Sequence, residues 1–179
     1  KSARPGLGVG NDYWDLLPFG GHDAMATMYL YDAIRAFSAL ERSVAKHPEW
    51  GIPAEAVPLD AQALIRLADE IRRDFQTRFW NRDTGRFNGW TDVEGRSYDY
   101  GFTFVNLEAV CYGLASAEQS QSIFAWLDGR RDVPGDTSCG ADIYRWRFAP
   151  RATTRRNVET YVWPWFRPEA GESKSALSS

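Results

Sequence analysis

The sequence has few histidines and cysteines, and their scarcity excludes several kinds of site. The two histidines are His22 and His47, so a histidine-rich metal site is excluded, and a Ser-His-Asp triad would have to use one of them. No nucleophile-elbow motif accompanies either residue. The two cysteines, Cys111 and Cys139, allow one disulfide at most, which is not the framework of a small secreted domain. Cysteine usage therefore does not reveal the cellular compartment. Since histidines and cysteines are so few, we also predict neither a metal nor another cofactor.

Excess positive charge and long apolar runs are also missing. Lysine and arginine number 21 against 24 acidic residues, a net charge of −3, which gives no electrostatic footprint for nucleic acid. No apolar run reaches the roughly 18 residues of a membrane span. The segment GLGVGN at 6–11 looks like a dinucleotide fingerprint, but Asn11 stands at the third glycine position and no strand precedes it. We therefore predict no nucleic acid, membrane or dinucleotide as a partner.

The chain does have enough length for one domain, and many aromatic side chains. We expect residues 1–166 of the 179 to belong to one domain and residues 167–179, which are polar, to form a disordered tail. Aromatic residues make up 15% of the chain and include eight tryptophans, more than a plain helical core needs. Because Trp and Tyr are costly to bury unless their polar edge finds a partner, we expect many of them to line a surface or a cleft.

Hydrophobic periodicity predicts four helices, at about 21–44, 60–79, 102–114 and 117–127. Apolar residues surround most of the first and third helices, which predicts that these two are buried. In the second and fourth helices the apolar residues lie on one side, which is typical of surface helices. Ser116 and Gln119 form a capping-box pattern at the start of the fourth helix.

This alternation of buried and surface helices favours an antiparallel array of αα-hairpins in two layers over a plain bundle, in which every helix is one-sided. We therefore predict an all-α fold with long loops. Antiparallel neighbours place the loop 10–20 and the links 80–101 and 128–157 at the same end. Within the first of these links we expect a small β-hairpin that turns at VEGR, residues 93–96. Long loops in a compact domain are usually functional.

These loops are rich in carboxylates and aromatic rings, a combination that suits sugars. Glycoside hydrolysis needs two carboxyl groups that flank the bond, and one of them must stay protonated near neutral pH. An apolar neighbour such as tryptophan raises a carboxyl pKa, and Trp14 stands directly beside Asp15. The acidic residues collected there are Asp12, Asp15, Asp23, Asp92, Asp99, Asp136 and Asp142.

A structural role competes with a functional one at each of these positions. Aspartate is common in loops because it makes Asx-turns, and it caps helices. Asp23 fits the first turn of the first helix, where a carboxylate favours the helix dipole. Glu108 stands within a buried helix pattern, which points to a buried ion pair or a cap contact. Arg145 and the run RATTRR at 151–156 fit a solvated stretch as well as a site for an anionic sugar.

Three segments resemble bacterial six-hairpin glycosidases, which are (α/α)6-barrel enzymes. They are NDYWDLLPFGGHDAMATMYLYDAIRA, YDYGFTFVNLEAVCYGLA and GDTSCGADIYRWRFAPRATTRRNVETYVWPW. The resemblance covers roughly residues 10–166 and is specific for the barrel superfamily, not for a substrate. It implies hydrolysis of an oligosaccharide or glycoside by two carboxyl groups on loops at one end of the barrel.

The resemblance also implies roles for particular residues. Asp15 would be the general acid, and Asp99 and Asp142 would be the other catalytic candidates. The residues implied to bind substrate are Tyr13, Trp14, His22, Tyr100, Asp136, Arg145 and Trp146.

The chain departs from the family in length, because it holds about two hairpins where a full barrel needs six. We therefore expect a fragment of a larger enzyme, which either self-associates or binds the missing remainder of the barrel. Two alternatives stay open. A non-catalytic carbohydrate-binding or interaction module would keep the aromatic loops, and a sugar epimerase or isomerase would use the same barrel. The second alternative normally needs histidine as acid and base, and this sequence has two.

Overall fold

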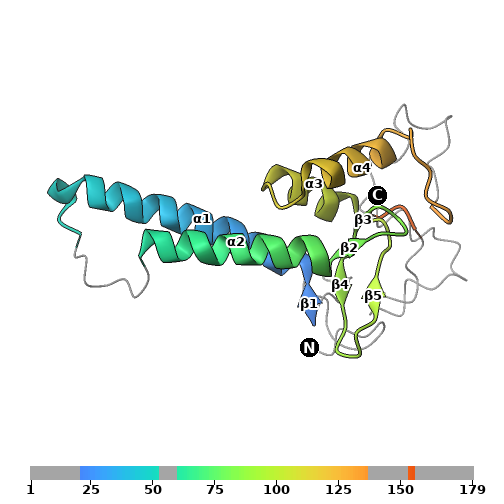
Figure 1. Ribbon diagram of the computed structural model, residues 1–179, viewed down its shortest axis with the longest axis horizontal. Coiled ribbons are helices and arrows are strands. Elements are labelled where there is room, and N and C mark those ends of the chain that lie inside the picture. The colour runs from blue at the N-terminus through green and yellow to red at the C-terminus, as the bar shows by residue number, and fades with distance from the viewer. Residues whose placement is uncertain (1–20, 53–59, 137–152, 156–179) are drawn as a thin grey trace, which may run out of the picture.

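The computed structural model describes residues 21–52, 60–136 and 153–155. Two long helices, α1 (Ala24–Lys46) and α2 (Ala61–Arg78), form a hairpin that projects from a mixed region of helices and strands (Figure 1). That region holds α3 (Thr103–Cys111), α4 (Ala117–Leu127) and five short strands. A 3-10 turn, η1 (Pro48–Trp50), follows α1. None of the described helices is long and apolar enough to cross a membrane.

The helices begin where side chains cap them. Asp23 accepts a hydrogen bond from the amide of Ala26 at the start of α1, so its structural role is the one that the sequence allowed. Asp60 caps α2 in the same way. The capping box predicted for α4 is confirmed: Ser116 accepts from the amide of Gln119, whose side chain accepts from the amide of Ser116.

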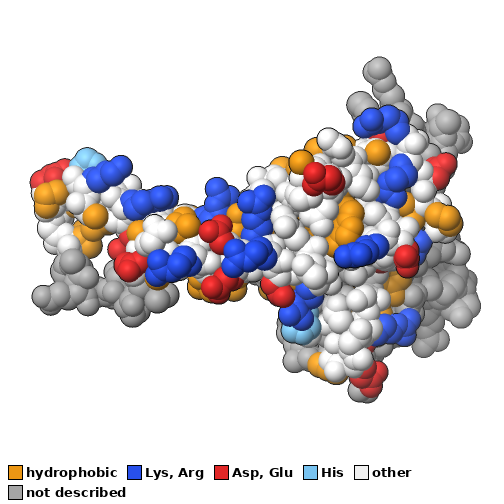
Figure 2. Space-filling view, viewed as in Figure 1, with side chains coloured by type: hydrophobic (Ala, Val, Ile, Leu, Met, Phe, Trp, Pro, Cys, Tyr) orange, Lys and Arg blue, Asp and Glu red, His pale blue; other side chains and the backbone are white. Residues whose placement is uncertain are grey.

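The α1–α2 hairpin has a one-sided apolar interface. Met28, Tyr31 and Ile34 of α1 are buried in the same core as three residues of α2, which are Leu64, Ala68 and Phe75. Charged side chains cover much of the visible surface of the hairpin (Figure 2). The prediction of a surface helix at 60–79 is thus confirmed. The prediction that α1 is buried on nearly all sides is wrong, because Leu30, Phe37 and Leu40 are exposed among the described residues.

The five strands form two small antiparallel sheets. In the first, β1 (His22–Asp23), β4 (Trp90–Thr91) and β5 (Ser97–Tyr98) lie in the order β1-β4-β5. In the second, β2 (Trp80–Asn81) pairs with β3 (Arg86–Phe87). The turn between β4 and β5 includes VEGR, so the predicted hairpin is confirmed.

The predicted fold class, an all-α toroid of αα-hairpins forming a partial (α/α)6 barrel, is wrong. The described residues form four α-helices together with two antiparallel sheets, which is a mixed fold. Hydrophobic periodicity did not reveal most of these strands, because strands of two residues are too short to show an alternation of polar and apolar residues, and β1 also pairs with a distant segment. α3 also ends at Cys111, three residues before the predicted end, and Gly113 then adopts a positive φ of 75°.

Three segments that are far apart in the sequence meet at one end of the α1–α2 hairpin. His22 and Asp23, which follow the opening loop, pair with Thr91 and Trp90. Phe102 forms an isolated bridge with Thr153, and the amide of Thr154 donates to the carbonyl of Tyr100 over 3.0 Å. The prediction that the links 80–101 and 128–157 share one end is confirmed for their described residues. The loop 10–20 lies outside the described residues, so for that loop it stays a prediction.

Candidate functional site

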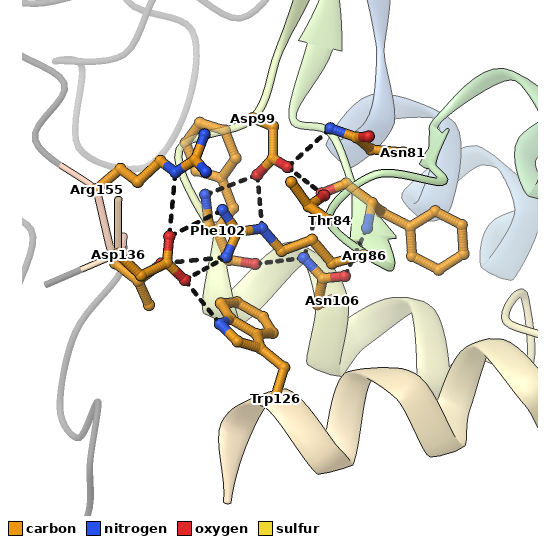
Figure 3. A network of polar contacts seen from close by, with 12 residues as sticks. Asn81, Thr84, Arg86, Asp99, Phe102, Asn106, Trp126, Asp136 and Arg155 are labelled. Atoms are coloured by element: carbon orange, nitrogen blue, oxygen red, sulfur yellow. Dashed lines mark hydrogen bonds and ion pairs between the residues drawn. The ribbon is translucent and has the colours of Figure 1, made fainter. Parts of the chain in front are cut away.

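The meeting point of these segments is built around the wholly buried side chain of Arg86 (Figure 3). Its Nε donates to Oδ1 of Asp99 over 2.7 Å. Both of its terminal nitrogens donate to the two carboxylate oxygens of Asp136, and the Nη2 to Oδ1 distance is 3.1 Å. The guanidinium also lies over the indole of Trp126, 4.6 Å from the ring centre. Arg86, which belongs to β3, therefore links this strand to the residue after β5, to α4 and to the segment after α4.

The carboxylate of Asp99 is surrounded by donors. Besides Arg86, it accepts hydrogen bonds from Asn81 Nδ2 over 3.0 Å, Thr84 Oγ1 over 2.6 Å and the amide of Gly101 over 3.0 Å. Its side chain is 7% exposed. Both oxygens are thus occupied by protein donors, an arrangement that fixes the position of the carboxylate.

Asp136 is held as firmly as Asp99. It accepts from the indole Nε1 of Trp126 over 2.8 Å and from Nε of Arg155 over 3.1 Å, in addition to Arg86. Burial alone would raise its pKa, but the hydrogen bonds and the charge of Arg86 outweigh burial, and the pKa of Asp136 is lowered. Arg86 and Arg155 thus balance the formal charge of the two aspartates, and the charge of Arg131 also acts on both of them.

This balance favours an anchoring role for both aspartates over acid catalysis. A general acid that works near neutral pH needs a raised pKa, whereas the pKa of Asp136 is lowered. A substrate hydroxyl would have to displace a protein donor to reach Asp99. Asp99, which the resemblance suggested as catalytic, and Asp136, which it suggested as substrate-binding, both lie in this network.

The aromatic residues of the same region form a stack inside the core. The rings of Trp90 and Tyr98 are 4.5 Å apart and nearly parallel, and Tyr100 and Phe102 continue the row. Burial, with a hydrogen bond to Asp92, raises the pKa of Tyr98 to about 12. Tyr100, predicted to bind substrate, is only 7% exposed. It therefore supports the sheet rather than presenting an open face to a sugar.

His22 is the predicted site residue that the structure leaves open to solvent. It lies in β1 opposite Thr91, whose hydroxyl is 3.0 Å from the hydroxyl of Ser97 in the next strand. The three side chains form a polar row across the sheet, since directly paired residues point to the same face. The remaining predicted site residues lie outside the described residues: Tyr13, Trp14, Asp15, Asp142, Arg145 and Trp146.

Glu108 is a further carboxyl group with an unusual environment. Burial raises its pKa, and a hydrogen bond with the hydroxyl of Tyr29 partly opposes the shift. Its Oε2 is buried and accepts no hydrogen bond from the described residues. The buried ion pair or cap contact that the sequence suggested for Glu108 is not found among those residues.

Sequence reasoning missed the centre of the network. Arg86 stands in the polar stretch DTGRFNG, where an arginine usually points into solvent, and Trp126 is one aromatic residue of a surface helix. The one sequence signal for a buried cation was the excess of carboxylates in the linking loops, since buried carboxylates are usually paired with cations. Among the described residues, no group of three or more His, Cys, Asp or Glu side chains is arranged to hold a metal ion.

Comparisons with protein-family models, with curated proteins and with solved structures found no match to this chain.

Proposed function

We propose that this chain is a glycoside hydrolase, or a part of one, that cleaves its substrate with paired carboxyl groups in an aromatic-lined cleft. The observation that supports the proposal most is that described residues from three segments, His22–Asp23, 80–101 and 128–136 with 153–155, meet at one end of the α1–α2 hairpin. An enzyme of this kind needs its carboxyl groups delivered from several loops to one place. The resemblance of the same segments to six-hairpin glycosidases points in the same direction.

Within this proposal, Asp15 is the general acid and Asp142 its partner. Asp99 is the weaker choice because its oxygens already accept hydrogen bonds from Asn81, Thr84, Arg86 and Gly101. The Arg86 network anchors the described parts of the links 80–101 and 128–157 to each other. His22, exposed on β1, is assigned to the sugar subsite together with Tyr13 and Trp14.

Hydrolysis of a panel of aryl-glycosides and disaccharides tests the proposal. The wild-type chain is expected to release sugar from at least one substrate, and Asp15→Asn should abolish turnover while leaving the circular dichroism spectrum unchanged. Asp12→Asn is the matched control, since Asp12 belongs to the same loop and has no assigned role. A longer chain that contains this sequence is assayed in parallel. Turnover by the longer chain alone would place the second carboxyl group outside these 179 residues. Normal turnover by Asp15→Asn would contradict the proposal.

A non-catalytic carbohydrate-binding module is the second candidate. This function is favoured because arginines pair with both carboxylates of the described network, Asp99 and Asp136. Neither carboxylate is then free to act on a substrate. Isothermal titration with the same sugars separates the two functions. A binding module is expected to bind without turnover and to keep its affinity in Asp15→Asn, whereas the hydrolase loses turnover.

A further inference from the structure

The link between Asn88 and Gly89 is prone to a chemical reaction that the fold holds back. In an open chain, the main-chain nitrogen that follows an asparagine can attack the carbonyl carbon of the asparagine side chain. Glycine permits this attack best, because it has no Cβ to obstruct the approach and its backbone is the most mobile. Among the asparagines of the chain only Asn88 is followed by glycine; the others are Asn11, Asn81, Asn106 and Asn157.

The fold restrains this link through the main chain. The nitrogen of Asn88 donates to the carbonyl of Phe79, and the nitrogen of Gly89 donates to the carbonyl of Tyr98, each over 2.9 Å. The carbonyl of Gly89 accepts from the nitrogen of Ala24, the first residue of α1, also over 2.9 Å. The link therefore lies where the start of α1, the end of α2 and β5 meet, and the nitrogen that would attack is held on β5.

The side chain of Asn88 has a weaker restraint. It is 5% exposed, and its Oδ1 is buried without a hydrogen bond from the described residues. Such atoms are rare, since most buried polar groups find a partner. No hydrogen bond to Oδ1 therefore fixes the reacting carbon. The protection of the link rests on the hydrogen bond from Gly89 to Tyr98 and on the exclusion of water.

The packing around Gly89 keeps the reactive pair in the sequence. A Cβ at this position would come within 2.5 Å of Cε2 and 2.9 Å of Cδ2 of Phe102, whose side chain is wholly buried. The ring of Phe102 also packs against the rings of Trp90 and Tyr100, which restricts its movement. The core therefore requires glycine after Asn88.

We propose that Asn88 is a deamidation site whose reaction is controlled by the separation of Gly89 from Tyr98. Once this hydrogen bond opens, the nitrogen of Gly89 attacks Cγ of Asn88 and a bond forms between the two atoms. The bond from Cγ to Nδ2 breaks, and Nδ2 leaves as ammonia with the proton of the Gly89 nitrogen. Water then opens the resulting five-membered imide at one of its two C–N bonds, which yields aspartate or isoaspartate at position 88. Water is the one co-reactant that this step needs.

The product does not fit the place that the asparagine occupied. Either product brings a carboxylate to a buried position, where a charge is costly unless a cation pairs with it. Isoaspartate also lengthens the main chain by one carbon, so the hydrogen bonds of residues 88 and 89 to Phe79 and Tyr98 lose their spacing. Reaction in the opened state therefore prevents full return to the original fold. This inference does not depend on the proposed glycosidase activity.

Peptide mapping by mass spectrometry tests the site on the whole chain, incubated at mildly alkaline pH with and without guanidinium chloride. In denaturant, the peptide that contains Asn88 is expected to change from amide to acid well before the peptides that contain Asn81 and Asn106. It should separate into an aspartate form and an isoaspartate form. Without denaturant, conversion of Asn88 should be slower by at least about tenfold, because only the opened fraction of the chain reacts.

A variant of β5 tests the control by Tyr98. Tyr98→Phe removes the hydroxyl that donates to Asp92 over 2.8 Å and should loosen this strand. Without denaturant, Asn88 is expected to convert several-fold faster in Tyr98→Phe than in wild type, and in denaturant at the same rate. Leu40→Ala is the matched control, because Leu40 is 54% exposed on α1, and it should keep the wild-type rates.

Three results would overturn the inference. The first is conversion of Asn88 in denaturant that is no faster than conversion of Asn81 and Asn106, which would remove the site. The second is an equal rate for Asn88 with and without denaturant, which would show that the fold does not protect the link. The third is equal rates in Tyr98→Phe and Leu40→Ala without denaturant, which would show that Tyr98 does not control the reaction.

Discussion

Arg86 and Asp136 are fifty residues apart in the sequence, yet Nη2 of one lies 3.1 Å from Oδ1 of the other. The carboxylate of Asp99 accepts a hydrogen bond from Nε, the third nitrogen of the same guanidinium. One buried cation thus connects the β2–β3 hairpin, the segment after β5 and the segment after α4. This contact holds the described parts of the links 80–101 and 128–157 together.

Arg86→Ala is expected to destabilise the chain by about 3–5 kcal/mol, because it removes the cation that two buried carboxylates share and leaves only Asp136 with a second arginine, Arg155. The side chain of Arg86 is 0% exposed, and those of Asp99 and Asp136 are 7% and 3% exposed. Denaturation in urea measures the change in the free energy of unfolding. Arg78→Ala is the control: the Arg78–Asp74 pair is exposed and should contribute no more than about 1 kcal/mol. Equal losses in the two variants would contradict a structural role for the network.

Gly101→Ala is expected to be more disruptive than Gly95→Ala. Both glycines have positive φ, 66° and 82°, so each substitution costs about 1–2 kcal/mol of backbone strain. A Cβ at Gly101 would also overlap Oγ1 of Thr154 and lie 3.0 Å from Nη1 of Arg86, whereas a Cβ at Gly95 meets open space. Thermal unfolding of the two variants gives the comparison. A melting temperature of Gly101→Ala at or above that of Gly95→Ala would show that Thr154 is not held against Arg86.

The ion cluster should make the chain sensitive to acid. The lowered pKa of Asp136 contributes stability above the unfolded-state pKa of about 3.9, and this stability is lost as the pH falls through the folded-state value. Asp136→Asn removes the contribution. The difference in unfolding free energy between wild type and Asp136→Asn is therefore expected to be largest near pH 6 and to shrink below pH 4. A difference that stays constant from pH 6 to pH 2 would rule out this linkage.

Glu108 should show the opposite dependence. Burial raises the pKa of Glu108, so the folded state favours its protonated form. The stabilising contribution is present below the unfolded-state pKa of about 4.3 and is lost as the pH rises through the folded-state value. Glu108→Gln, which stays neutral, is expected to gain stability relative to wild type at pH 7 and little at pH 4. Glu118→Gln is the control, because the pKa of exposed Glu118 is lowered instead. A Glu108→Gln variant less stable than wild type at pH 7 would refute this prediction.

The sequence predicted local features well and distant pairings badly. The helix at 117–127 and the hairpin at VEGR follow from capping, turn and periodicity signals that lie within a few residues, and the structure has both. The pairing of His22 with Thr91 joins two-residue strands from distant segments, which no local pattern reveals. The mixed fold class was missed because of this pairing, and because the two-residue strands of the local β2–β3 hairpin are too short to show a period-two pattern.

The candidate site was predictable in outline only. Acidic and aromatic loops at one end of the helical hairpin were foreseen, but the partners of each carboxylate were not. Whether Asp99 faces a substrate or Arg86 depends on where the backbone brings a residue thirteen positions earlier, and composition carries no such information. The burial of Tyr100 depends in the same way on its contacts with Trp90 and Phe102.

The most direct measurement compares Asp99→Asn with Asp15→Asn on the substrate that the panel identifies, with turnover per folded molecule and unfolding free energy measured for both. Asp99→Asn is expected to lower the free energy of unfolding and to keep turnover within a few-fold of wild type. Asp15→Asn is expected to keep the stability and lose turnover. A stably folded Asp99→Asn without turnover, beside an active Asp15→Asn, would instead make Asp99 the catalytic carboxylate and remove that role from Asp15.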